Sequence, residues 1–166
     1  MSDYSKTLDK PDQQETFANV LIVDEGVVNY DTVMTFAAAR TQGDITVKAV
    51  VAGKGELNLT GNLIIEKSGI NARGFLKQDI LLLSESARAK ATPQLEIKTD
   101  EVRASHSATV GQVDQEQLFY LQARGLNKRE AIATIVKSFL SETIEQLAIS
   151  RQKEVRSRLD EFIAKL

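Results

Sequence analysis

The sequence contains no cysteine, one histidine and only 5% aromatic residues. Without thiols, the chain alone can form no disulfide framework, no thiolate cage for an iron–sulfur cluster and no cysteine-rich zinc site. No apolar run approaches the roughly 20 residues of a membrane-spanning helix. Residues 1–17 also lack the basic start and apolar stretch of a signal peptide. We therefore expect a cytoplasmic protein with no membrane partner.

Neither sign of charge dominates, because 21 basic and 23 acidic residues give a formal net charge of -2. No global field attracts nucleic acid or an anionic membrane, so such binding would have to be local. With 42% apolar residues, the 166-residue chain can build a core. This length suits one ordinary domain or two small, mutually dependent ones.

Residues 1–17 are polar, contain Pro11 and show no periodicity, so we expect a disordered arm, with an arm that pairs with a partner as the alternative. From residue 18 to 112, short apolar runs separated by glycine, asparagine or aspartate predict strands and turns. A spacing of eighteen residues separates Ile45, Leu63 and Leu81, which suggests that successive strands stack as coils of a solenoid. A small sandwich or barrel fits the same strand lengths.

The C-terminal part, residues 113–166, has the periodicity of helices. Asp114 is a suitable N-cap for a short helix ending at Arg124–Gly125, and Asn127 with Glu130 forms a capping box for a longer one. A third amphipathic helix is predicted over 151–166. Strands first and helices last favour an α+β chain or two docked subdomains over alternating β-α-β units.

The single histidine, His106, shares the apolar parity of the last predicted strand with Val102, Ala104, Ala108 and Val110. As a metal ligand it offers one imidazole, with Asp100, Glu101 or Asp114 as candidate carboxylate companions. One imidazole is not a site, so a metal role implies groups from a second chain. The alternative is a buried, hydrogen-bonded histidine at the end of a strand stack.

No catalytic residue is predicted. Ser105 and Ser107 flank His106 but point to the opposite face of a strand, and no second histidine is present. A hydrolase would also need a third group and oxyanion donors, which no motif marks. We therefore expect the chain not to be an enzyme.

Residues 118–140 also have the pattern of a helix-turn-helix, with Lys128 and Arg129 near the start of the second helix. From Leu126 to Leu166, eight basic residues only slightly outnumber six acidic ones, and base-reading side chains are not aligned on one face. A docking surface for a protein is therefore favoured, and a nucleic-acid-binding or general interaction module is the alternative. Phe119 and Tyr120 suit interface anchors, although core packing of both rings is equally compatible.

Three stretches closely resemble the C-terminal core of the SufB/SufD family, most of all its SufD branch: LLLSESARAKATPQLEI, DEVRASHSATVGQVDQEQLFYLQARGL and EAIATIVKSFLSETIEQL. The resemblance covers residues 43–147. It implies a mainly β fold, a right-handed parallel β-helix followed by a small C-terminal helical domain. Family members are usually longer, so we expect a shortened β-helix of four or five coils.

The resemblance also implies a function, that of a non-catalytic scaffold subunit of iron–sulfur cluster assembly. The β-helix would pair with a SufB/SufD-type subunit as a hetero- or homodimer. The helices would dock a SufC-type ABC ATPase through Phe119, Tyr120, Arg124 and Gly125. No nucleic-acid partner is implied.

His106 matches a family histidine near the paired β-helices, which makes it a candidate ligand shared across the subunit interface. Ala87 and Ala104 stand where family members carry cysteine, and Ser105 and Ser107 replace glutamates that flank the histidine in the SufB branch. The isolated chain is therefore expected to hold no cofactor, and a transient iron–sulfur cluster would form only at the interface with a partner.

Overall fold

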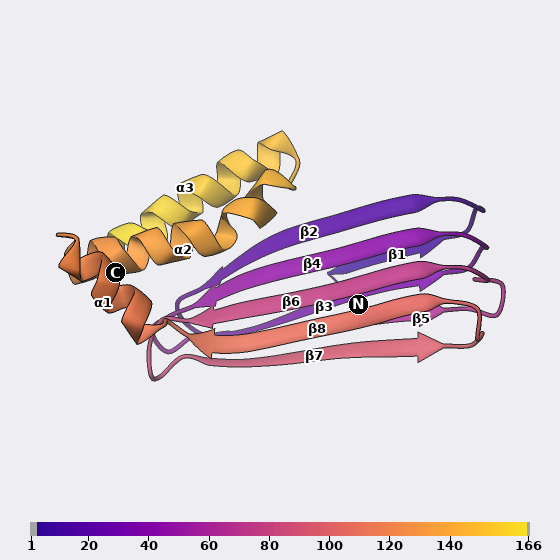
Figure 1. Ribbon diagram of the computed structural model, residues 1–166, viewed down its shortest axis with the longest axis horizontal. Helices are drawn as coiled ribbons and strands as arrows, with labels where there is room; N and C mark the ends of the chain where they lie inside the picture. Colours follow the sequence, from indigo (N-terminus) through magenta and orange to yellow (C-terminus); the bar gives the residue numbers. More distant parts are fainter. Residues whose placement is uncertain (1–2, 166) are drawn as a thin grey trace.

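The computed structural model describes residues 3–165, which fold into eight strands followed by three helices (Figure 1). The strands form two parallel sheets in the orders β1-β3-β5-β7 and β2-β4-β6-β8. Because successive strands alternate between the sheets, the chain winds into a β-helix of about four coils, which confirms the predicted fold class. The strands are β1 (Tyr4–Leu8), β2 (Gln14–Val23), β3 (Val27–Phe36), β4 (Gln42–Val51), β5 (Glu56–Ile65), β6 (Arg73–Leu82), β7 (Arg88–Ile97) and β8 (Arg103–Gln112).

The predicted disordered arm over residues 1–17 is corrected by the structure. β1 and β2 are strands that pair in parallel with β3 and β4. The rings of Tyr4 and Phe17 stack with centroids 3.6 Å apart, and Lys6 Nζ lies 3.1 Å from Glu15 Oε2. The prediction was wrong because β1 and β2 form the first coil of the β-helix, and polar side chains such as Lys6 and Glu15 occupy some of its inward-facing positions. These polar residues hide the alternation of apolar residues that marks a strand. Residues 1 and 2 lie outside the described part of the chain.

The eighteen-residue spacing does not mark the coils. Ile45 pairs with Leu76, and Leu63 pairs with Leu95. One full coil contains two strands and two turns, so equivalent residues are separated by 28 positions between Tyr4 and Thr32 and by 32 between Glu56 and Arg88. The turns differ in length, and this variation hides a fixed repeat from the sequence.

The main core fills the space between the two sheets. Its fully buried side chains include Met34, Phe36, Ile45 and Leu63. Gln78 is also fully buried there, and neither polar atom of its amide has a hydrogen-bond partner among the described residues. Burial of an unpaired amide costs stability, so this position weakens the core.

The helices are α1 (Gln115–Ala123), α2 (Lys128–Glu145) and α3 (Ile149–Lys165). The predicted caps are confirmed: Asp114 accepts hydrogen bonds from the first turn of α1, and Asn127 with Glu130 forms a capping box on α2. Gly125, at φ +98°, ends the first helical segment in the left-handed conformation that glycine adopts without strain. In residues 3–165, no helix is long and apolar enough to cross a membrane.

α2 and α3 lie over one half of the outer face of the β2-β4-β6-β8 sheet (Figure 1). Two cations attach them to the first coils. Lys48 Nζ donates to the Phe139 carbonyl at 2.9 Å and lies 5.0 Å from the centroid of that ring. Arg158 donates to the Ile22 carbonyl, also at 2.9 Å. Sequence reasoning missed Lys48, because nothing in an isolated strand shows which face a distant helix will cover.

Candidate functional site: the open end of the β-helix and the exposed face of α1

The last coil leaves one end of the β-helix open. β7 and β8 are the edge strands of the two sheets, and within residues 3–165 no further strand pairs with either outer edge. Their inward-facing residues cover the core only in part, so Ile97 is 45% exposed and Val110 is 42% exposed. By register with the preceding coil, the inward-facing residues are Ala89, Ala91, Pro93, Leu95, Ile97, Ala104, His106, Ala108 and Val110.

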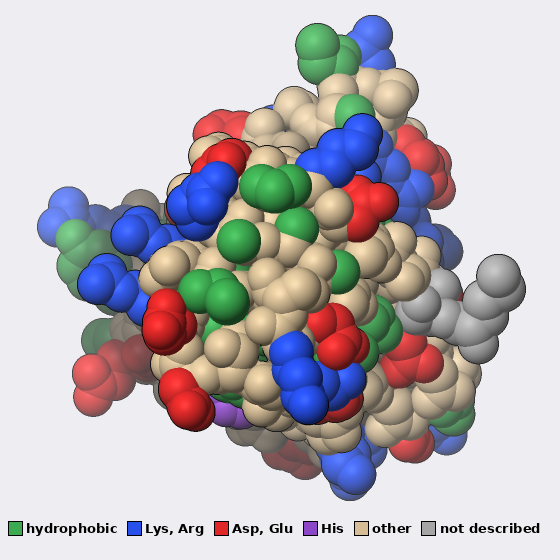
Figure 2. Space-filling model, turned by 90° about the vertical axis from the view of Figure 1, so that its right-hand side faces the viewer, with side chains coloured by type: hydrophobic (Ala, Val, Ile, Leu, Met, Phe, Trp, Pro, Cys, Tyr) green, Lys and Arg blue, Asp and Glu red, His purple; other side chains and the backbone are tan. Residues whose placement is uncertain are grey.

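His106 lies on this open end. It pairs in register with Leu76, which is fully buried, so its side chain occupies the inward face of β8 as predicted. The side chain is nevertheless exposed, and the alternative of a buried, hydrogen-bonded histidine is therefore wrong. The reason is that β8 is the last strand of residues 3–165, and no further coil formed by these residues covers it. Figure 2 looks along the strands at the turns on one side of the β-helix, and the purple atoms of a histidine side chain are partly visible in its lower left part.

The structure does not gather the candidate carboxylate companions around His106. Asp100 and Glu101 lie in the turn before β8, and Asp114 lies beyond its other end. In the described part of the chain, no group of three or more histidine or acidic side chains is placed to hold a metal ion. His106 would supply a single imidazole to a metal or cluster, and the other ligands would have to come from outside these residues.

A second exposed feature is the outer face of α1. Phe119 is 73% exposed and Tyr120 is 57% exposed, so core packing of the two rings is excluded. Arg124 Nη2 donates to Tyr120 Oη at 3.1 Å, and its guanidinium lies 5.2 Å from the centroid of that ring. The aromatic face is therefore partly ordered before any partner binds. A shallow groove, lined by Gln115, Glu116, Phe119, Tyr120 and Ala123, follows this face.

The helix-turn-helix pattern corresponds to α1, the Gly125 turn and α2. The apolar face of α2 packs on the β-helix through buried residues that include Val136 and Leu140. Arg129 donates to the Ala164 carbonyl at the end of α3. One of the two cations at the start of the second helix is thus engaged within the fold, which gives the nucleic-acid alternative no support.

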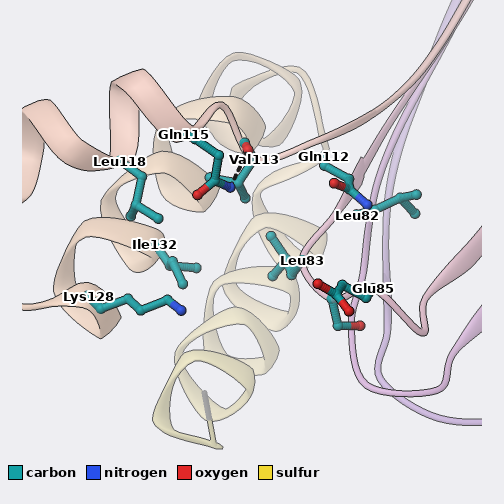
Figure 3. Close-up of a pocket in the computed structure, with 10 residues that line it drawn as sticks. Leu82, Leu83, Glu85, Gln112, Val113, Gln115, Leu118, Lys128 and Ile132 are labelled. Atoms are coloured by element: carbon teal, nitrogen blue, oxygen red, sulfur yellow. Dashed lines mark hydrogen bonds between the residues drawn. The ribbon is translucent and has the colours of Figure 1, made fainter.

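A cleft of about 430 Å³ lies between α1, the start of α2 and the turn that follows β6 (Figure 3). Lys128 enters it from the helical side and Glu85 from the turn after β6, while Leu83 and Ile132 form apolar walls. Sequence reasoning missed this cleft because its lining comes from three separate segments. α1 therefore packs on α2, and the cleft leaves space between α1 and the turn after β6.

Comparisons with known proteins identify a family that this chain matches over most of its length. A family model described as "SUF system FeS cluster assembly, SufBD core domain" matches residues 1–139. The chain is 38% identical over 100 residues to the iron-sulfur cluster assembly protein SufD of Escherichia coli, covering 60% of this chain and 24% of that protein. It is 33% identical over 130 residues to SufD of Bacillus subtilis, covering 78% and 30%.

An iron-sulfur cluster assembly SufBD family protein of Archaeoglobus fulgidus is 30% identical over 150 residues, covering 90% of this chain and 40% of that protein. The matched regions thus account for less than half the length of each of these three relatives. The family model covers the β-helix, α1 and most of α2 of this chain, and each relative contains a large part that this chain does not match.

Proposed function

This chain belongs to the SufBD family, and on that premise we propose that it is a non-catalytic, SufD-type scaffold subunit of iron–sulfur cluster assembly. In this proposal α1 docks a SufC-type ABC ATPase and the open end of the β-helix pairs with a SufB/SufD-type subunit. Nucleotide hydrolysis would take place in the docked ATPase, and this chain would supply binding surfaces.

The observation that carries the ATPase-docking proposal is the exposed aromatic face of α1. Large aromatic side chains are usually withdrawn from water, and exposed ones at the surface of a helix are typical interface anchors. The Arg124 hydrogen bond holds the Tyr120 ring, so less side-chain freedom is lost when a partner binds. Phe119 and Tyr120 would therefore contribute most of the docking energy.

The open end supports the pairing proposal. Strands β7 and β8 each contain ten residues and expose an outer edge that no other strand in the described chain pairs with. Long unpaired edges readily add strands from another chain. Exposed Ile97 and Val110 would be buried by such a partner. Pairing would also bring groups of the partner chain close to His106.

The attachment of the helices suggests how docking and pairing are coupled. α1 is linked covalently to β8 through Val113 and Asp114, whereas α2 and α3 pack on β2 and β4. A force on α1 would therefore reach both the last coil and the first coils. The cleft beside α1 leaves room for this helix to move when an attached ATPase changes conformation.

An iron–sulfur cluster is the cargo in this proposal. This chain contributes no thiolate, so His106 is the side chain that would bind iron, with the remaining ligands from the paired subunit. Its exposure on the inward face of the last strand leaves the imidazole accessible to such a group.

The docking proposal can be tested by co-purification with a SufC-type ATPase. The wild type is compared with the double variant Phe119→Ala, Tyr120→Ala, and with Ile149→Ala as a matched control. Ile149 is 75% exposed on α3, so its truncation removes a similar exposed apolar group elsewhere on the helices. Circular dichroism confirms that each variant is folded.

We expect the wild type and Ile149→Ala to retain the ATPase and the folded double variant to lose it. Retention by the double variant would show that α1 is not the docking helix. No complex with a folded wild type would refute the ATPase-docking proposal itself.

A further inference from the structure

The first coil of the β-helix has two free strand edges, those of β1 and β2. Free edges offer N–H and C=O groups to strands of other chains, and proteins commonly protect them. β1 contains only five residues, and the Ala37 amide donates to the Leu8 carbonyl, so its even-numbered residues bond to β3. Only Ser5 and Thr7 of β1 therefore face outward. An edge this short offers few hydrogen bonds to an incoming strand.

β2 contains ten residues and is long enough to accept a strand. The Gln42 amide donates to the Gln13 carbonyl, so odd-numbered residues of β2 bond to β4. The even-numbered residues direct their N–H and C=O groups to the free edge. These residues are Gln14, Thr16, Ala18, Val20 and Ile22. The edge of β2 is therefore the position at which the first coil would add a strand.

Two contacts within the chain occupy the second half of this edge. The outward N–H of Val20 donates to Asn19 Oδ1 at 2.9 Å. The outward carbonyl of Ile22 accepts a hydrogen bond from Arg158 Nη2, also at 2.9 Å. Arg158 belongs to α3, which packs against β2 and, in Figure 1, lies on the side of the molecule where β2 forms the edge of its sheet. An incoming strand would have to displace both contacts.

The first half of the β2 edge is protected by charge. Lys6 and Glu15 pair in register with inward-facing residues of the next coil, so both charged side chains point inward. Lys6 Nζ lies 3.1 Å from Glu15 Oε2, and the two side chains are 40% and 29% exposed. A strand or coil added there would take this ion pair out of water, which costs free energy. Inward-pointing charges protect strand edges in this way.

We propose that the first coil is a sealed end of the β-helix, protected against strand addition by Arg158 of α3 and by the inward-facing Lys6–Glu15 pair. This gives α3 a role separate from the docking proposed for α1. A β-helix with two associating ends would stack without limit, because contacts that do not close generate filaments. One sealed end restricts the chain to closed complexes. The inference does not depend on which partner covers the other end.

The contribution of charge is tested with two matched double variants. Lys6→Leu with Glu15→Leu replaces the inward-facing ion pair by apolar side chains. Lys137→Leu with Asp160→Leu is the control, because it makes the same replacement at an ion pair between α2 and α3. Association is measured by sedimentation velocity over a concentration series, and circular dichroism with thermal unfolding establishes that each variant is folded.

The contribution of α3 is tested with two single variants in the same experiment. Arg158→Ala removes the hydrogen bond to the Ile22 carbonyl. Arg156→Ala is the control, because Arg156 is an exposed arginine of the same helix. Both variants replace arginine by alanine within α3, so the loss of charge and the change in helix propensity are matched.

We expect the folded Lys6→Leu, Glu15→Leu variant to self-associate at least about tenfold more tightly than the wild type. Arg158→Ala should do so about fivefold more tightly. Both should form assemblies larger than any of the wild type at the same concentration, and both controls should sediment like the wild type. Equal growth in the controls, or none in the folded variants, would refute the sealed end. Pairing of the open end is read from the wild type and its partner, so the two failures are distinguishable.

Amide hydrogen exchange of the wild type provides a measurement that needs no substitution. The Val20 amide should exchange at least about tenfold more slowly than the amides of Thr16 and Ala18, which face the same edge. The reason is that the Val20 N–H has its acceptor on Asn19, within the chain. Equal exchange at the three amides would show that the second half of the edge is open, and would overturn the inference.

Discussion

The first and last coils of the β-helix lie at opposite ends of one core and cover it to different extents. At the first coil, Tyr4 stacks on Phe17, and Asn19 Nδ2 donates to Tyr30 Oη at 2.6 Å. At the last coil, the inward-facing residues are mostly small, and Ile97 is 45% exposed. Large side chains that interact with one another thus cover the core at the first coil, while the last coil leaves it partly uncovered.

This difference shows that the two coils contribute to different properties. Contacts within the first coil are made inside one chain and therefore stabilise the fold. The exposed apolar residues and unpaired strand edges of the last coil contribute fully only when another chain covers them. Substitutions in the last coil should accordingly affect association more than unfolding.

The largest expected effect comes from two leucines that are neighbours in register, Leu63 in the middle of the β-helix and Leu95 on the open end. Leu63→Ala should lower the free energy of unfolding by about 3 kcal/mol, because Leu63 is fully buried. Leu95→Ala should cost about 1 kcal/mol, because its site is only partly covered. Urea denaturation at a concentration that keeps the chain monomeric gives both values. Equal losses would contradict the description of an open end.

A smaller effect is expected one coil beneath the open end, at Gln78. Gln78→Met should raise the free energy of unfolding by about 1 kcal/mol, because it removes a buried amide without hydrogen-bond partners at similar volume. Gln42→Met, at an exposed position on the neighbouring strand, is the control and should change stability little. Urea midpoints measure both. A destabilised Gln78→Met would show that the amide is satisfied, for example by a buried water.

The smallest expected effect concerns the first coil at high pH. Burial, with the nearby charge of Glu15, raises the pKa of the Tyr4 phenol from 10.0 to about 12. The folded state therefore retains the proton more tightly, and this stability is complete below pH 10 and lost as the pH rises toward 12. Tyr4→Phe should flatten part of the alkaline decline in the urea midpoint. Tyr120→Phe, at an exposed tyrosine, is the control, and an unchanged decline in Tyr4→Phe would refute the prediction.

Local patterns predicted the elements that are regular over their whole length. Short apolar runs between turn residues predicted strands where β4 and β5 lie, and the capping residues Asp114 and Asn127 located the starts of α1 and α2. β1 was missed because, with five residues, it is too short to show a period. The coil repeat was missed because the connecting turns vary in length.

The candidate site was predicted only in part. The strand parity of His106 was correct, and the aromatic pair of α1 was identified as a docking surface with core packing left open. The exposure of His106 was not predictable, because parity states which face a side chain occupies and not whether another strand covers it.

By itself, the sequence determined the order of strands and helices, the caps, the absence of thiolate ligands and the face of the strand on which His106 lies. These properties depend on neighbouring residues along the chain. Only the tertiary structure decided that β7 and β8 are edge strands, that the rings of α1 remain in water and that Lys48 is covered by α2. Burial and pairing depend on segments far apart in the sequence, and no local pattern records which of them meet.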